Sequence, residues 1–214
     1  MFSAIVFDFD GTLVDTNTIK RQGFFHVASD FAGDLMAMKA VLASITGDRH
    51  TILEAYAKRV LVQPGESARQ IVDDLVAAYS SMVDAAVVSA PEMPGATRLL
   101  EALRCRGRKL YLSSATPFDN LQGIMAKRNW ADRFDGIFGG PTSKADVLRH
   151  VMSVTGLCSN TIAVVGDGED DRCSAMSVGC TFFPVGEARG TLAHEKIYTL
   201  SELITVLCGS KEIP

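Results

Sequence analysis

The feature that most constrains this chain is the regular alternation of short apolar runs with helical patterns. Apolar residues between the later runs recur three and four positions apart, as in Leu99, Leu100 and Leu103, which is typical of a helix packed on a sheet. Alternating strands and helices predict an α/β fold with a doubly wound parallel sheet. The expected strands span Ala4–Phe9, Lys109–Ser113, Gly136–Phe138, Thr161–Val165 and Cys180–Pro184.

The long interval between the first two expected strands does not follow this rhythm. It carries apolar stripes at helical spacing, the first of them through Leu35 and Met38, and no strand pattern. We therefore expect a small all-helical domain, residues 16–90, inserted after the first strand. The α/β core is expected to comprise residues 1–15 and 91–214.

Charge and composition limit the partners that the chain can have. A formal net charge of -4 offers no overall basic surface, so a nucleic acid partner is not expected. No apolar run approaches the length of a membrane span, and the amino terminus lacks a positively charged signal region, so we expect a cytoplasmic protein without a membrane partner. The five cysteines lack CxxC spacing and are expected to be buried or partly buried thiols in a reducing compartment.

Acidic side chains follow two of the expected strands. Asp8 and Asp10 come at the end of the first, and Asp167 and Asp171 come after the fourth. The carboxyl ends of parallel strands meet at one edge of a sheet, where such folds bind ligands. Several carboxylates at one edge require a cation, and hard oxygen ligands that leave room for a phosphate favour Mg²⁺.

Groups suited to a phosphate follow the other strands. Lys144 opens a helix, whose first amides favour an anion, and Ser114 with the backbone amides of Ala115 and Thr116 offers further hydrogen-bond donors. Thr12 can tie its loop by a hydrogen bond, and we count it with these phosphate-binding residues. The sequence therefore predicts a site for a small phosphorylated metabolite.

Four stretches of the chain carry a family resemblance. "DFDGTLVDT", "LYLSSATP", "SKADVL" and "VVGDGEDDRCSAMSVG" resemble, in this order, the four motifs of the haloacid dehalogenase superfamily of aspartate-nucleophile phosphatases. The resemblance covers the whole chain. The insertion is similar in length and position to the helical cap of the subgroup that contains phosphoglycolate phosphatase and β-phosphoglucomutase.

The resemblance implies a role for each acid. Asp8 would attack the phosphoryl group and form an aspartyl-phosphate. Asp10 would act as the general acid and base, and its backbone carbonyl would bind Mg²⁺. Asp167 would complete the metal ligands together with Asp8, and Asp171 would orient Lys144 or a metal-bound water.

The phosphate-binding residues also match motif positions. The resemblance implies that Ser114 holds the phosphoryl oxygens and that Lys144 neutralises their charge. Ser113 is the alternative to Ser114, and either Glu169 or Asp170 could approach the metal. The chain departs from the subgroup's pattern in having Ala, not the usual Pro, directly after the motif lysine.

Substrate choice is expected to lie in the inserted domain. In this subgroup a loop between cap helices contacts the substrate, and "ITGDRHT" is the candidate here. Arg49 in this loop could pair with a second anionic group, and the alternative is an exposed arginine near a helix start. Trp130 is expected to pack in the core or at its edge.

The function predicted from these features is a Mg²⁺-dependent phosphatase. A β-phosphoglucomutase-type sugar phosphomutase is the alternative, because it uses the same groups. A non-catalytic module that binds metal and phosphate is a weaker alternative. A phosphonatase would need a lysine in the insertion, for which Lys20 and Lys39 are the open candidates. The oligomeric state is left open.

Overall fold

The computed structural model describes residues 2–60, 66–186 and 196–209. The chain divides into two compact units. The core unit comprises Met1–Thr16 and Ala90–Pro214, and the inserted unit comprises Asn17–Ser89.

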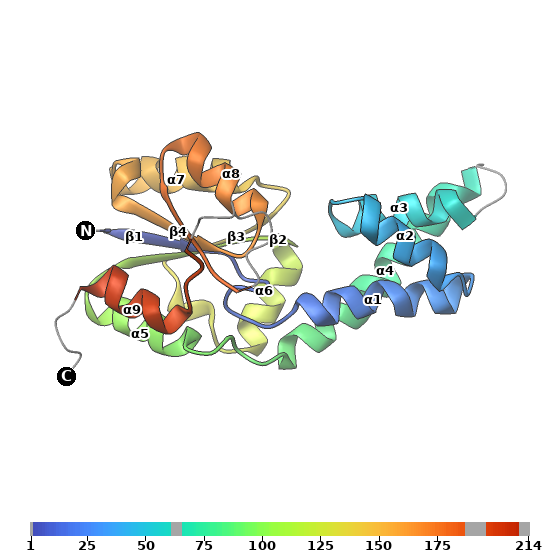
Figure 1. The fold of residues 1–214 in the computed structure, drawn as a ribbon, viewed down its shortest axis with the longest axis horizontal. Helices are drawn as coiled ribbons and strands as arrows, with labels where there is room; N and C mark the ends of the chain where they lie inside the picture. The colour runs from blue at the N-terminus through green and yellow to red at the C-terminus, as the bar shows by residue number, and fades with distance from the viewer. Residues whose placement is uncertain (1, 61–65, 187–195, 210–214) are drawn as a thin grey trace. The chain divides into compact units, whose positions relative to one another are not determined.

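The core unit contains a five-stranded sheet in the order β3-β2-β1-β4-β5, in which all neighbouring strands pair in parallel (Figure 1). Helices α7 and α8 lie on one face, and α5 and α9 lie on the other. The fold class predicted from the sequence is confirmed. The strands are β1 Ala4–Phe7, β2 Lys109–Pro117, β3 Gly136–Gly140, β4 Ile162–Gly166 and β5 Thr181–Pro184. The helices are α5 Ala96–Cys105, α6 Phe118–Lys127, α7 Lys144–Thr155, α8 Glu169–Val178 and α9 Leu200–Cys208, with short 3₁₀ turns η1 Ala131–Arg133 and η2 Ser159–Thr161.

Burial explains why β1 and β4 read as continuous apolar runs. Both are interior strands of the sheet, and every residue of both is buried. Parallel strands that are covered on both faces have no solvent side and need no polar alternation. Leu99, Leu100 and Leu103 of α5 are also buried, as their spacing predicts.

The strand ends at the carboxyl edge differ from the predicted ones. The first apolar run was expected to stay extended to Phe9, but β1 ends at Phe7. The chain then turns at Gly11, whose φ of 77° lies in the left-handed region that glycine tolerates best. In contrast, β2 continues beyond Ser113 to Pro117, past an irregularity in its pairing with β3. The acids therefore lie on a loop, while the Ser114 region lies on a strand.

The inserted unit is all-helical in its described residues. Its helices are α1 Asn17–Phe31, α2 Leu35–Ser44, α3 Arg49–Val60 and α4 Glu66–Ser89. Phe24 of α1 stacks on Tyr79 of α4 with ring centroids 4.3 Å apart. A Cβ on Gly23 would lie 2.6 Å from Val83, so glycine lets α1 approach α4 closely. Met38 is buried as its stripe predicts, but Leu35 is 43% exposed because it opens α2.

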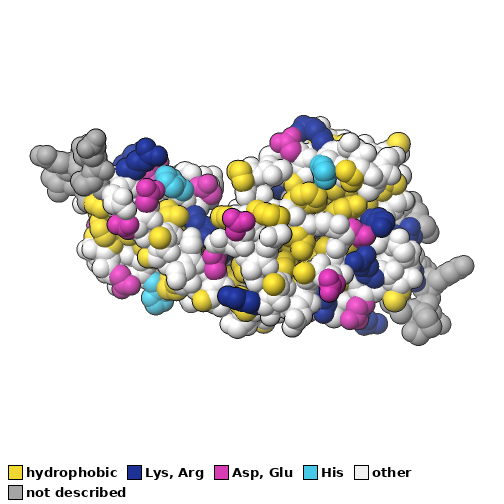
Figure 2. Space-filling view, turned by 180° about the vertical axis from the view of Figure 1, so that it is seen from behind, with side chains coloured by type: hydrophobic (Ala, Val, Ile, Leu, Met, Phe, Trp, Pro, Cys, Tyr) yellow, Lys and Arg dark blue, Asp and Glu magenta, His cyan; other side chains and the backbone are white. Residues whose placement is uncertain are grey.

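The protein carries mixed charges on the face drawn in Figure 2, and three of its cysteines are exposed. Within the described ranges, no helix is long and apolar enough to cross a membrane. Acidic and basic side chains are interspersed over the face drawn in Figure 2. All five cysteines are free thiols. Three of them, Cys105, Cys158 and Cys173, are exposed, which corrects the expectation of burial, because each lies at or beyond a helix end or on a helix's outer face.

Candidate active site

Asp8 lies directly after β1 and is held by the ends of neighbouring elements. Its backbone N–H donates to the carbonyl of Val165 at 2.9 Å, which keeps it in register with β4. Its carboxylate is buried. Oδ1 accepts a hydrogen bond from Lys144 Nζ at 2.8 Å, and Oδ2 accepts one from Thr12 Oγ1 at 3.2 Å. The loop that turns at Gly11 brings Thr12 back to the carboxylate.

Lys144 bridges two carboxylates. It is the first residue of α7, whose N-cap Ser143 accepts a hydrogen bond from the Asp146 amide. Nζ donates to Asp8 and, at 2.6 Å, to Oδ1 of Asp171. Burial disfavours the charged ammonium, but the charges of Asp8 and then Asp171 outweigh burial and raise the pKa of Lys144. Lys144 is therefore a fixed positive charge at neutral pH.

Asp171 reaches this position because β4 ends in a glycine. A Cβ on Gly166 would lie 2.3 Å from the Asp171 carboxyl carbon, so another residue there would displace the acid. The second oxygen, Oδ2, accepts a hydrogen bond from the backbone N–H of Gly168 at 3.2 Å. The Asp171 side chain, on the first turn of α8, thus accepts hydrogen bonds from the backbone just before this helix and from Lys144.

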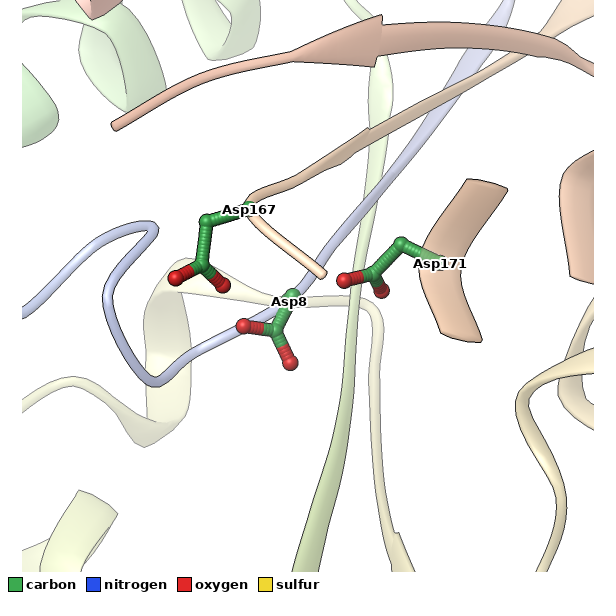
Figure 3. A group of neighbouring side chains, drawn as sticks. All are labelled: Asp8, Asp167 and Asp171. Carbon is green, nitrogen blue, oxygen red and sulfur yellow. The ribbon is translucent and has the colours of Figure 1, made fainter. Parts of the chain in front are cut away.

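Three carboxylates converge at this edge of the sheet (Figure 3). Asp8, Asp167 and Asp171, called the carboxylate cluster below, each offer an oxygen within 4.8 Å of the others. Burial and the charge of Asp8 raise the pKa of Asp171, to about 7, against the opposing effect of Lys144. One ammonium does not balance three carboxylates, and the donors are hard oxygens. The residues present therefore fit a divalent cation such as Mg²⁺.

Asp10 has a different set of partners from Asp8. Thr16 Oγ1 donates to Asp10 Oδ1 at 2.8 Å, while Ser114 Oγ and Thr116 Oγ1 donate to Oδ2 at 3.1 and 3.2 Å. The structure thus brings Asp10 together with Ser114 but does not place the Asp10 carboxylate in the carboxylate cluster. The metal role predicted for Asp10 concerns its backbone carbonyl and stays a prediction.

Ser114 lies on β2, where both it and Ser113 are buried. The hydroxyl of Ser114 faces the site, because it donates to Asp10 and accepts from the backbone N–H of Thr116 at 3.0 Å. These contacts favour Ser114 over Ser113 for the site. Ala115, the next residue, is exposed at this edge.

The two further acids of the fourth motif lie outside the carboxylate cluster. Glu169 and Asp170 are exposed on the first turn of α8. Glu169 forms an ion pair with the guanidinium of Arg172 and accepts a weak hydrogen bond from the Cys173 thiol. The contacts of Glu169 are therefore with its own helix.

Arg49 is engaged inside the inserted unit. Its Nη1 donates to Ser80 Oγ at 2.6 Å and lies 3.8 Å from a carboxylate oxygen of Asp84. The guanidinium carbon lies 5.5 Å from the centre of the Tyr79 ring. These contacts tie the start of α3 to α4. The predicted contact of Arg49 with a substrate stays a prediction.

Two hydroxyls of the site were not assigned to it from the sequence. Thr116 was considered only for its backbone amide, although alternation along an extended strand places residues 114 and 116 on the same side. Thr16 is the last residue of the first motif stretch, in a position to which the sequence assigns no role in the site. Its bond to Asp10 depends on how the loop after Gly11 folds back, and no local pattern of the sequence signals this.

Relatives and solved structures resemble the chain along most of its length. A phosphoglycolate phosphatase from Cereibacter sphaeroides is 28% identical over 186 residues, which cover 83% of this chain and 82% of the relative. The crystal structure of a predicted phosphoglycolate phosphatase from Haemophilus somnus has a TM-score of 0.78 at 18% identity, covering 96% of this chain and 98% of that chain. The structure of CbbY from Rhodobacter sphaeroides in complex with phosphate has a TM-score of 0.71 at 17% identity, covering 95% of this chain and 96% of that chain.

The two solved structures share the fold of this chain over nearly its whole length. A family model described as haloacid dehalogenase-like hydrolase matches residues 5–185, which include the whole inserted unit, most of the core unit and every residue of the carboxylate cluster. The resemblance drawn from the motifs and the prediction of a hydrolase are thereby confirmed. The chain belongs to the haloacid dehalogenase-like hydrolases.

Proposed function

We propose that the protein is a Mg²⁺-dependent phosphatase that hydrolyses a small phosphorylated metabolite through an aspartyl-phosphate on Asp8. The observation that carries the proposal is the bridge from Lys144 Nζ to Asp8 and Asp171, with Asp167 in the same cluster. This arrangement presents a nucleophile, a fixed cation and an excess of carboxylate oxygens at one edge of the sheet. Phosphoryl transfer needs positioning and neutralisation of charge more than any other help.

The metal and the lysine have separate tasks in this proposal. Asp8 and Asp167 would hold the cation, with the backbone carbonyl of Asp10. When bound, Mg²⁺ would reduce the repulsion between the Asp8 carboxylate and the incoming phosphate. Lys144 would neutralise a phosphoryl oxygen, and Asp171 would keep the ammonium in place through its 2.6 Å hydrogen bond.

The covalent steps use Asp8 and Asp10. An oxygen of Asp8 attacks phosphorus while the bond to the leaving oxygen breaks, and protonated Asp10 gives its proton to that oxygen. Asp10, now ionised, takes a proton from a water molecule whose oxygen attacks phosphorus. The bond between the Asp8 oxygen and phosphorus then breaks, which restores the Asp8 carboxylate and releases inorganic phosphate. Hydroxyls of Thr16, Ser114 and Thr116 hold the Asp10 carboxylate apart from the Lys144 bridge. The nucleophile and the acid therefore keep separate partners.

Phosphoglycolate is the first substrate to test. The relative from Cereibacter sphaeroides carries the name phosphoglycolate phosphatase and aligns with 83% of this chain. We further propose that the inserted unit acts as a cap and that Arg49 contacts the carboxylate of such a substrate. Because Nη1 makes both polar contacts described for Arg49, an anion would use the other nitrogens of the planar guanidinium.

A panel of phosphorylated compounds tests this proposal. Phosphoglycolate, phosphoserine, sugar phosphates, nucleotides and an aryl phosphate are each incubated with the protein and Mg²⁺, and released phosphate is measured. We expect turnover of one or more of the small metabolites that stops when a chelator removes the metal. Isomerisation of a hexose 1-phosphate without phosphate release would instead support the phosphomutase alternative.

A further inference from the structure

The two chain segments that lead to and from the inserted unit are paired with each other in the core unit. The backbone N–H of Asp15 donates to the carbonyl of Pro91, and that of Met93 donates to the carbonyl of Leu13, both at 2.9 Å. Val14 and Glu92 form an antiparallel bridge between these bonds. The segments 13–16 and 90–93 are called the outgoing and return segments below.

The return segment is also held by side chains from the end of α6 and from η1. Arg128 Nη1 donates to the carbonyl of Ala90 at 2.8 Å. Arg133 Nη1 donates to Thr97 Oγ1 at 2.9 Å, and this hydroxyl donates to Glu92 Oε2 at 2.5 Å. Two arginines therefore fix the return segment at residue 90 and, through a threonine, at residue 92.

Trp130 lies between these two arginines. The guanidinium carbons of Arg128 and Arg133 lie 5.0 and 5.2 Å from the centre of the indole ring, within the range of a cation–π interaction. Asn129 adopts a left-handed φ of 55° and ends α6. This conformation, which asparagine tolerates better than most residues, turns the chain so that Arg128 and Trp130 meet.

The other contact of Trp130 leads to the active site. Its ring packs edge to face on Phe9, with centroids 6.4 Å apart and planes at 87°. Phe9 is fully buried and stands between Asp8 and Asp10 in the chain, and its carbonyl accepts from the N–H groups of Leu13 and Val14. The same indole ring thus contacts the residue between the two acids and both arginines that hold the return segment.

We propose that Trp130 and Arg128 are positioning residues that couple the paired segments leading to the inserted unit to the loop that carries Asp8 and Asp10. The contacts that carry this coupling are those of Trp130 with Phe9 and of Arg128 with the carbonyl of Ala90. The effect on turnover rests on the proposed function, whereas the effect on the paired segments does not. The two effects can therefore be measured separately.

The test uses Arg128→Met, which keeps the length of the side chain but removes the donor to Ala90. Arg104→Met is the matched control, because Arg104 also donates to a backbone carbonyl, that of Asp132 at 3.0 Å, but binds Asp135 rather than the paired segments. Amide hydrogen exchange at Asp15 and Met93 reports the pairing in each variant, and kcat and KM are measured on the best phosphate ester of the panel.

We expect Arg128→Met to accelerate exchange at Asp15 and Met93 about tenfold, which is the size expected for one lost hydrogen bond, and Arg104→Met to leave it unchanged. We expect kcat to fall about fivefold or more with little change in KM, since the contacts of Phe9 are disturbed without any loss of a substrate contact. Arg128→Lys, which keeps a donor, should change the exchange rate and kcat less than Arg128→Met does. Trp130→Phe, which keeps an aromatic ring, should change them less than Trp130→Leu does.

Three results would overturn the inference. Equal exchange rates in Arg128→Met and Arg104→Met would show that Arg128 does not hold the paired segments. Faster exchange with an unchanged kcat would show that the pairing is not coupled to the catalytic loop. Equal losses in Trp130→Phe and Trp130→Leu would show that the aromatic contact with Phe9 is not what matters. A wild-type protein without turnover would contradict the proposed function. The exchange measurement would still show whether Arg128 holds the paired segments.

Discussion

The core unit and the inserted unit each hold a largely buried cationic side chain, and the two cations have unlike surroundings. The side chains of Lys144 and Arg49 are each only 13% exposed. Lys144 lies within hydrogen-bond distance of two carboxylates, with Asp167 as the third member of their cluster. Arg49 meets one carboxylate, at 3.8 Å, together with a hydroxyl and an aromatic ring.

The difference lies in charge, since the degree of burial is the same. A buried cation that is matched by one carboxylate and a hydroxyl joins two helices and can remain as it is. An ammonium that is outnumbered by carboxylates leaves negative charge that a further cation can neutralise, and such sites are typical of functional positions. The comparison supports the proposed role of Lys144 in catalysis, and it gives Arg49 a structural role in addition to any contact with substrate.

The largest effect should come from Lys144→Met, which removes the charge while keeping much of the side chain's volume. We expect kcat/KM for an aryl phosphate to fall about a hundredfold to a thousandfold, as when a group that stabilises charge in the transition state is lost. Released phosphate measures this. Arg49→Met is the matched control in the inserted unit, and a loss of equal size there would remove the distinction between the two cations.

Metal dependence tests the excess of negative charge directly. Asp167→Asn keeps the shape of the side chain but removes one carboxylate charge, so the Mg²⁺ concentration for half-maximal activity should rise about tenfold to a hundredfold. Asp170→Asn, an exposed change in the same motif, serves as the control. An identical Mg²⁺ dependence in wild type and Asp167→Asn would contradict the assignment of Asp167 as a ligand.

Arg49→Ala should affect stability more than basic turnover. Loss of the hydrogen bond to Ser80 and the ion pair with Asp84 is expected to lower the free energy of unfolding by about 1–3 kcal/mol. Thermal unfolding measures this, with exposed Arg149→Ala for comparison. Turnover of an aryl phosphate should be retained. Unchanged discrimination between phosphoglycolate and the aryl phosphate would contradict the proposed substrate contact.

Glu169→Gln should have the smallest effect. Glu169 is exposed and pairs with Arg172 on its own helix. The value of kcat/KM should therefore change by less than about twofold, and the melting temperature should not change measurably. A strong dependence of activity on Glu169 would mean that the metal site extends beyond the carboxylate cluster. The Mg²⁺ titration used for Asp167→Asn decides this.

Much of the site follows from the sequence, because its positions are set by strand ends. Asp8, Ser114, Lys144 and Asp171 each follow or end an apolar run, and a parallel sheet brings such positions to one edge. The contacts of Lys144 with Asp8 and Asp171 join residues that were predicted for the same site. In these places, local pattern and topology together determine the neighbours.

The parts that could not be predicted depend on how side chains meet across loops and between helices. The partners of Arg49 lie on α4, 31 residues further along in the case of Ser80, and helical periodicity does not say which positions of two helices face each other. The hydroxyl of Thr16 reaches Asp10 only through the turn at Gly11. Helix α1 was not identified by its stripe, since glycine and polar residues interrupt its apolar face.

Asp8→Asn is the most direct test of the central claim that Asp8 is the nucleophile of a phosphatase. Phosphate release from the best substrate of the panel is measured with Mg²⁺ for wild type and for this variant, with circular dichroism as a check on folding. We expect turnover in the wild type and a loss of about a thousandfold or more in the folded variant. Turnover by Asp8→Asn at a rate close to that of the wild type would contradict the assignment.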